Sequence, residues 1–392
     1  MAKGTACMTM AIPDYASLDE ALEMLRPYGP ELHNGNSNHA PMAAEAMCAL
    51  GRGDTVIDWV DRYRRSLQPA RTSYSIIRQS EWRDALGQSD RVADWQAFFA
   101  NELAEHPWSE VLDRWVARLA AGIIAAAAHG AIRTAHAARS LAASQNEARL
   151  YELAAGLAYW AAEYRTLPGM PDPGIGSATP PGESEFAQRP SMSPGASNLA
   201  RRSMMSTRMT PARAIEAIEL LPVARRGVLK SLTGALPELD TFDPFRGVIW
   251  MIEVPHDSAA VLSELTNGFA EVLLTNATTP LLTIAFVHCL TAIYAVRNLA
   301  PHLSSETTRS AVRYGWQAAA ALYTVLGTKA HSTVDDVTPA FKRDELIDRA
   351  IRGGDEHAIK YTEACLSEYV LSPSPIYLRA ADHAISWLTP SR

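Results

Sequence analysis

The 392-residue sequence predicts an all-α protein: a single large helical domain over residues 1–392 with one internal loop rich in proline, glycine and serine. Three observations predict this fold class. Amphipathic runs with helix-capping residues occur along most of the chain. Only one segment, 248–254, has the composition of a strand, and one strand cannot form a sheet. No internal repeat occurs at the periods of solenoid proteins.

Helix signals in the first half of the chain follow one another closely. Ser17 and Glu20 form a capping box before an amphipathic run that ends at Pro27. Asn38 is a candidate N-cap for the next helix, which has Pro41 in its first turn. The further helices that we expect in this half cover residues 54–68, 90–105, 107–129 and 147–164.

The alanine-rich segment before His129 is expected to be helical. Gly122, Ala125 and Ala126 would then share a helical face with His129 and leave space for a metal, a substrate or a neighbouring helix. Gly130 marks either a break in this helix or a point through which it continues to residue 136.

The composition changes after residue 167. Residues 168–197 are rich in proline, glycine and serine, so we expect a flexible internal loop or linker there. It could separate two domains, but we favour an insertion within one domain, because candidate site residues lie on both sides of it. Helix signals resume at Thr210-Pro211. Helices are then expected from about 259 onward and over 280–298, 305–326, 342–352, 355–369 and 380–388.

Composition and charge limit the possible functions. The formal net charge of −7 argues against nucleic-acid binding, which needs a basic face. The four cysteines (7, 48, 289 and 365) are far apart and form no CxxC pair, so we expect a cytoplasmic protein. The N-terminus lacks the apolar run of a signal peptide, and the apolar stretch 119–128 is too short to span a membrane.

Common catalytic motifs are absent from the sequence. No GxGxxG follows a strand, and there is no P-loop, GxSxG or HExxH motif and no carboxylate-rich di-iron pattern with two ExxH motifs. The remaining candidates for chemistry are histidines and one lysine. Four of the eleven histidines stand in apolar or small-residue helical segments: His39, His129, His288 and His357.

Neighbouring residues suggest what these histidines could contact. His136 lies seven residues after His129 and shares its helical face, and Arg133, four residues after it, could orient an anion or a phenolate. His288 lies in a segment that is apolar nearly all round. A buried imidazole needs hydrogen-bond partners, and Thr291 could be one. For any one of these histidines, a hydrogen-bonded core residue is the more common alternative.

Lys360 follows His357 by three residues and shares its helical face. Only five of the 36 basic residues are lysines, so the chain generally uses arginine where a positive charge is needed. Lysine can lose its proton when it is desolvated or lies beside a cation, whereas arginine cannot. A neutral lysine amine can add carbon dioxide and become a carboxylate-like metal ligand. An ordinary surface lysine is the alternative.

Five short patterns, in this order, resemble the questin oxidase-like family. They are Asn38-His39-Ala-Pro-Met42, His129-Gly130-Ala-Ile-Arg133, Leu157-Ala-Tyr159-Trp160-Ala161, Val287-His288-Cys-Leu-Thr291 and Asp355-Glu356-His357-Ala-Ile-Lys360. The resemblance extends over nearly the whole chain. It implies an all-helical fold and oxidative ring opening of anthraquinone-type polyketides, by Baeyer–Villiger-like oxygen insertion or by dioxygenation.

The resemblance also implies a non-haem iron centre. In an iron-dependent branch of the family, four histidines and a carboxylated lysine hold Fe(II), and the matching positions here are His39, His129, His288, His357 and Lys360. Neutral imidazoles suit iron, copper, zinc and nickel, and a carboxylate would offset part of the metal charge. Five ligands leave one octahedral position for dioxygen or water. Candidate catalytic residues on the substrate side are Arg133, His136 and Tyr159.

Two alternative functions remain open. The first is a metal-free Baeyer–Villiger-type oxidase in which the histidines act as general bases on a phenol. Some family members are described as needing reduced nicotinamide, and because no nucleotide fingerprint occurs here, NADPH would act through a partner reductase. The second alternative is a non-catalytic helical protein that binds a small aromatic ligand.

Overall fold

The computed structural model describes residues 12–169, 208–226, 232–328 and 341–389. Within these residues the regular elements are helices, apart from one two-stranded antiparallel sheet, so the predicted all-α fold class is confirmed. The predicted loop 168–197 lies outside the described residues from residue 170 onward. The extent of the single domain, residues 1–392, stays a prediction.

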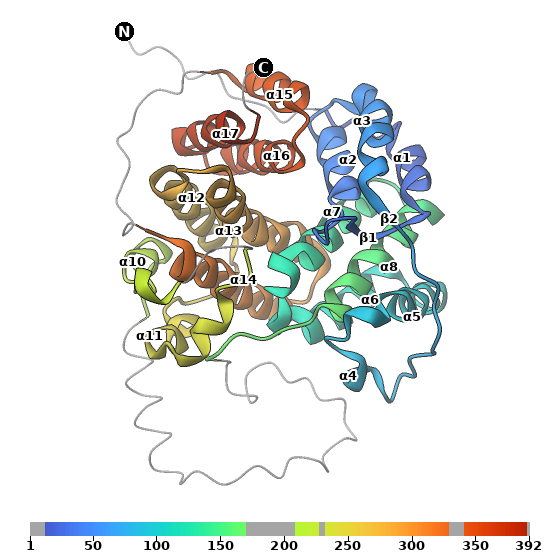
Figure 1. Ribbon diagram of the computed structural model, residues 1–392, viewed down its shortest axis with the longest axis horizontal. Helices are drawn as coiled ribbons and strands as arrows, with labels where there is room; N and C mark the ends of the chain where they lie inside the picture. Colours follow the sequence, from blue (N-terminus) through green and yellow to red (C-terminus); the bar gives the residue numbers. More distant parts are fainter. Residues whose placement is uncertain (1–11, 170–207, 227–231, 329–340, 390–392) are drawn as a thin grey trace.

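Helices of the first and second halves of the chain lie on opposite sides of the molecule, with α7 and α13 near the middle (Figure 1). The first half contains α1 (Leu18–Leu25), α2 (Ala40–Ala49), α3 (Val56–Tyr63), α4 (Trp82–Ala85), α5 (Val92–Glu105), α6 (Trp108–Leu119), α7 (His129–Ala143) and α8 (Glu147–Ala162). The second half contains α10 (Pro211–Glu216), α11 (Asp243–Arg246), α12 (Ala259–Asn276), α13 (Pro280–Leu299), α14 (Ser305–Leu326), α15 (Arg343–Gly353), α16 (Glu356–Leu371) and α17 (Pro375–Leu388).

Several element boundaries differ from those predicted. Ser17 is the N-cap of α1, but its side chain makes no capping hydrogen bond. The helix predicted over 54–68 ends at Tyr63, because the chain then pairs as β2 (Leu67–Pro69) with β1 (Tyr28–Leu32). The candidate strand 248–254 is wrong, since it begins with a short 3-10 turn. α17 begins five residues earlier than predicted, with Pro375 in its first turn.

The predicted helix 107–129 is interrupted before His129. α6 ends at Leu119, and residues 126, 127 and 128 have φ angles of 46°, 56° and 69°, a left-handed conformation that alanine rarely adopts. α7 then starts at His129 itself, so the small residues before it do not share its helical face. Gly130 is not the break. It lies in the first turn of α7, where an added Cβ would be 2.5 Å from Trp160 Cα.

The long apolar helix of the protein is α13. Together with the turn that follows it, residues 280–302 are long and apolar enough to cross a membrane, but 72% of the most apolar 18-residue stretch is buried inside the protein. Among the described residues, this segment, rather than the 119–128 stretch, is therefore the candidate membrane span. Its burial is typical of a core helix.

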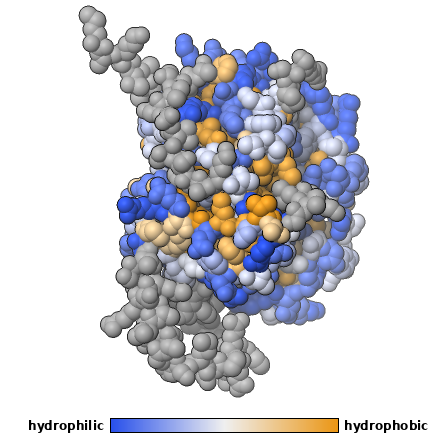
Figure 2. All heavy atoms as spheres, turned by 60° about the vertical axis from the view of Figure 1, so that its left-hand side comes forward, coloured by the Kyte–Doolittle hydropathy of each residue, from blue (hydrophilic) through white to orange (hydrophobic). Residues whose placement is uncertain are grey.

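The face shown in Figure 2 has apolar side chains near its middle and polar side chains around them. It lies over the helices on the left of Figure 1, on the side away from α1 and α3. On the described surface, large hydrophobic side chains that are exposed include Leu371 and Trp387, at 60% and 37% of their area.

Candidate metal centre

Four neighbouring helices carry the five predicted metal ligands. His39 is the N-cap of α2, His129 is the first residue of α7, and His288 is the ninth residue of α13. His357 and Lys360 are the second and fifth residues of α16. α7 contacts α2 and α13, and α16 contacts the same two helices. Three of the histidines therefore stand at the beginnings of helices that meet at one place.

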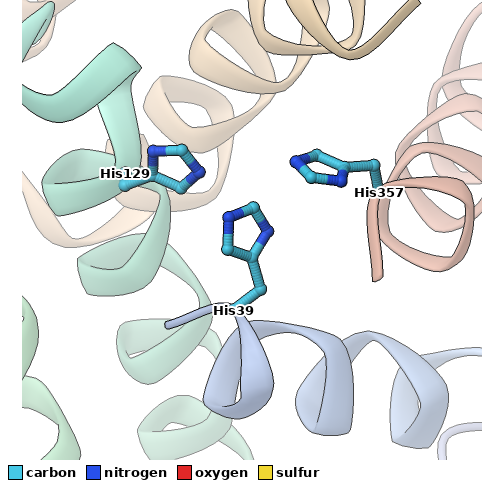
Figure 3. A group of neighbouring side chains, drawn as sticks. All are labelled: His39, His129 and His357. Atoms are coloured by element: carbon cyan, nitrogen blue, oxygen red, sulfur yellow. The ribbon is translucent and has the colours of Figure 1, made fainter. Parts of the chain in front are cut away.

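The four imidazoles gather in one buried cluster, which we call the histidine cluster. The ring centroids of His39 lie 4.4 Å from those of both His129 and His357, and those of His129 and His288 are 4.6 Å apart. Ligand-type atoms of His39, His129 and His357 lie within 4.8 Å of one another. Figure 3 shows these three rings converging on a common space from α2, α7 and α16. Each of the four residues is 7% exposed or less.

The Nε2 lone pairs of His129 and His288 point toward each other. The Nδ1 of His129 donates to the Ala126 carbonyl, and that of His288 donates to the Ile284 carbonyl at 2.7 Å, not to Thr291, whose hydroxyl donates within its own helix. A neutral imidazole protonated at Nδ1 has only a lone pair at Nε2. The two Nε2 atoms are 3.0 Å apart. Two nitrogens bound to one metal at about 2.1 Å, with about 90° between the bonds, lie about 3.0 Å apart.

One further feature fits a bound cation, and a second brings Lys360 to the site. The Nδ1 of His357 is buried and has no hydrogen-bond partner among the described residues, since the Asp355 and Glu356 carboxylates lie 3.8 Å away. Lys360 Nζ donates to His39 Nδ1 at 3.0 Å and its residue is only 2% exposed. The ordinary alternative of a surface lysine is therefore wrong for Lys360.

Burial keeps the four imidazoles neutral. Burial, together with the positive charges of neighbouring groups, lowers the pKa of three of them well below the usual range and that of His288 to about 3. Burial also lowers the pKa of Lys360 to about 8, although the carboxylates of Glu356 and Asp355 oppose this. The cluster thus offers neutral nitrogen donors, and its lysine loses a proton more readily than an exposed one.

Asn38 fixes the segment that carries His39. Its Nδ2 donates to the Gly29 carbonyl in β1, and its Oδ1 accepts from the backbone N–H of Ala40, both at 2.9 Å. The backbone N–H of Asn38 also donates to the Pro30 carbonyl at 2.7 Å. The N-cap position predicted for Asn38 belongs to His39 instead, and Asn38 connects the start of α2 to β1.

Arg133 and Tyr159 make their polar contacts outside the histidine cluster. The Arg133 guanidinium binds the Glu152 carboxylate of α8 through two contacts of 2.5 and 2.7 Å. The Tyr159 hydroxyl lies 2.8 Å from Ser37 Oγ, two residues before His39. An anionic substrate at Arg133 would therefore compete with Glu152. Their catalytic roles stay predictions.

His136 belongs to a second buried polar group, which sequence reasoning did not identify. Its Nδ1 donates to Glu45 at 2.6 Å. Arg139 binds Glu45 at 2.8 Å through Nε and Glu363 at 2.6 Å through Nη1, and the Tyr294 hydroxyl donates to Glu363 at 2.7 Å. We call these five residues the Glu45 layer. They come from the four helices that carry the histidine cluster.

The Glu45 layer adjoins the histidine cluster. His136 and Lys360 line one narrow gap between α7, α13 and α16. Burial alone would raise the pKa of Glu45, but the charges and hydrogen bonds of Arg139 and His136 together outweigh burial and the pKa falls to about 2, so Glu45 is ionised. One signal in the sequence could have identified this layer: Glu45 is the only charged residue of α2.

The chain matches a model of a known protein family. A family model described as questin oxidase-like matches residues 36–365, which include the five predicted ligands and the three predicted catalytic residues. No curated protein matches the chain.

Proposed function

Because the chain belongs to the questin oxidase-like family, we propose that it is an oxygenase that cleaves a ring of an aromatic polyketide of the anthraquinone or hydroquinone type. The family match supports an oxidoreductase, and the buried histidines support a metal-dependent one. We propose Fe(II) as the metal and dioxygen as the co-substrate. The described cysteines, Cys48, Cys289 and Cys365, are free thiols, which is compatible with action in the cytoplasm.

The contact between His129 Nε2 and His288 Nε2 carries the metal proposal. Two lone pairs 3.0 Å apart in a buried site repel each other, and a cation that binds both nitrogens removes this repulsion. His39, His129, His288 and His357 would hold the metal through neutral nitrogens. Iron bound there would supply the site at which dioxygen is activated beside an electron-rich ring.

We propose that Lys360 becomes the fifth ligand by carboxylation. The neutral Nζ forms a bond to the carbon of carbon dioxide. The electron pair of one C=O π bond moves to its oxygen, which becomes the carboxylate anion, and the nitrogen releases one proton. Because burial lowers the pKa of Lys360 to about 8, a fraction of this amine is neutral near physiological pH. The new carboxylate would offset charge that four neutral imidazoles leave unbalanced.

We keep three residues as candidates for the substrate side. His136 donates through Nδ1 to Glu45, so its Nε2 would accept a proton from a phenol. Arg133 would bind a phenolate by exchanging its contact with Glu152. The Tyr159 hydroxyl would orient the substrate from the segment beside the start of α2.

The function is tested with a hydroxyanthraquinone and its hydroquinone under ¹⁸O-labelled dioxygen. We expect a ring-opened product that contains label, loss of activity on chelation, and recovery with Fe(II). Full activity in protein freed of iron, with NADPH and a reductase supplied, would favour the metal-free oxidase. Ligand binding without oxygen uptake, equally in the parent and in His357→Ala, would favour a non-catalytic binding protein.

The ligand role of Lys360 is tested by Lys360→Arg. Arginine cannot form the carboxylated side chain, so we expect metal affinity to fall by about tenfold or more. The matched control is Lys342→Arg, because Lys342 is an exposed lysine at the start of α15. Elemental analysis measures the bound metal, and ¹³C NMR after exposure to ¹³CO2 measures the carboxylated lysine. A Lys360→Arg protein with parental metal content would contradict the carboxylated lysine.

A further inference from the structure

The chain makes an unusual turn immediately before His129. Ala126, Ala127 and Ala128 are the only described non-glycine residues with positive φ. In this conformation the Cβ of an L residue comes too close to the following carbonyl oxygen, which glycine avoids and alanine does not. Alanine is also the best helix former, so these residues would favour a continuous helix. Such strain persists only where the surrounding structure holds it.

The turn supplies a carbonyl to His129. The Ala126 carbonyl accepts from His129 Nδ1. The comparison with His288 shows why this matters: His288 Nδ1 donates to Ile284, four residues earlier in the same regular helix. His129 is the first residue of its helix, so no preceding helical turn offers it a carbonyl. The left-handed turn takes the place of that missing turn.

We propose that the turn at residues 126–128 is a positioning element that holds His129 in the Nδ1–H tautomer and directs its Nε2 at His288 Nε2. This proposal depends on the proposed function in one respect, which is the metal that these two nitrogens would bind. The tautomer of His129 in the metal-free protein is independent of that metal. Hydrogen-bond partners of ligand histidines typically change metal affinity by about 10–100-fold, which sets the size of the expected effect.

The test substitutes Ala126, which is partly exposed. Valine is β-branched and avoids positive φ, whereas asparagine has a similar size and tolerates it. We expect Ala126→Val to weaken Co(II) binding by about tenfold or more and to shift His129 to a mixture of tautomers. Ala126→Asn and Ala126→Gly should stay within about threefold of the parent. The tautomer is read by ¹⁵N NMR of labelled histidine in metal-free protein.

Ala121→Val is the matched control, because Ala121 is partly exposed, as Ala126 is, and does not have a positive φ. It should keep the parental tautomer. If Ala126→Val does not fold, Ala126→Thr replaces it against Ala126→Asn, because threonine is also β-branched but its hydroxyl suits a partly exposed site. Equal tautomers and equal affinity in the valine and asparagine variants would overturn the proposal. A parent protein that binds no metal would contradict the proposed function, while the tautomer comparison would still decide the positioning role.

Discussion

The polar side chains at the centre of this protein are of two kinds. The imidazoles of the histidine cluster are neutral because burial lowers their pKa values. Glu45 is ionised because Arg139 lies against it, and Arg133 pairs with Glu152 in the same way. A buried charge with its partner removed is costly, whereas a pair replaced by apolar residues is often tolerated. Comparing the removal of one partner of an ion pair with the replacement of both partners therefore distinguishes a structural role from a catalytic one.

Arg133 offers such a separation. Arg133→Met leaves the Glu152 carboxylate buried and unpaired, so we expect the free energy of unfolding to fall by about 3–5 kcal/mol. The double variant Arg133→Met/Glu152→Leu should recover most of that loss in urea denaturation. A recovered but inactive double variant would support a substrate role for Arg133, and an active one would exclude it. No recovery would contradict the ion pair as the source of the loss.

At the scale of elements, the start of α7 is set by close packing against α8. A Cβ added at Gly130 would lie 2.5 Å from Trp160 Cα, and one at Gly156 would lie 2.9 Å from the backbone nitrogen of Thr134. Both contacts are to backbone atoms, which cannot move alone. The two glycines therefore fix how near α7 approaches α8, and with it the position of His129 at the start of α7.

Gly130→Ala tests this packing. In an open helix the change would stabilise the protein, but here the new methyl group must push α7 away from α8. We expect the free energy of unfolding to fall by about 1–3 kcal/mol and metal affinity to fall with it. Gly247→Ala is the control, because nothing lies within 4 Å of its added Cβ. A stabilised Gly130→Ala protein that binds metal normally would show that this contact does not position His129.

Most elements could be predicted from the sequence, and the exceptions have physical causes. The helix propensity of alanine predicted a helix through residues 126–128. α7 instead starts at His129, and helix propensity gives no information on where packing makes a helix start. β1 and β2 are short and contain Pro30 and Pro69, so they lack strand periodicity.

Sequence reasoning identified part of the candidate site. The residue types of the five proposed ligands were recognisable, but only packing shows that α2 and α16 bring His39 and Lys360 together. Helical spacing placed Arg133 beside His129, whereas its guanidinium turns to Glu152.

At the scale of the whole molecule, the Glu45 layer joins four helices through charged contacts. The carboxylate of Glu45, from α2, binds His136 and Arg139 of α7, and Arg139 also binds Glu363 of α16. Tyr294 adds α13 through its bond to Glu363. Because Glu45 must be ionised for these contacts, the stability of the whole bundle depends on pH.

Acid should weaken the protein through Glu45. The pKa of this group is about 2 in the folded protein against an ordinary 4.5, so its stabilising contribution is complete above pH 4.5 and is lost as pH falls toward 2. We expect the difference in unfolding free energy between the parent and Glu45→Gln to shrink by about 2 kcal/mol from pH 7 to pH 3. Glu20→Gln, at an exposed site, is the control. A difference that is constant with pH would contradict a depressed pKa for Glu45.

The contact between His39 and Lys360 joins residues that are 321 positions apart in the chain. The apolar cluster formed by α1, α2 and α3 also includes Ile359 of α16. At ordinary rates of translation, a ribosome needs on the order of tens of seconds to add that many residues. During this time His39 of the nascent chain has no contact with Lys360. The apolar cluster of α1, α2 and α3 also lacks Ile359. The proposed metal could therefore contact all five of its proposed ligands only after α16 has left the ribosome.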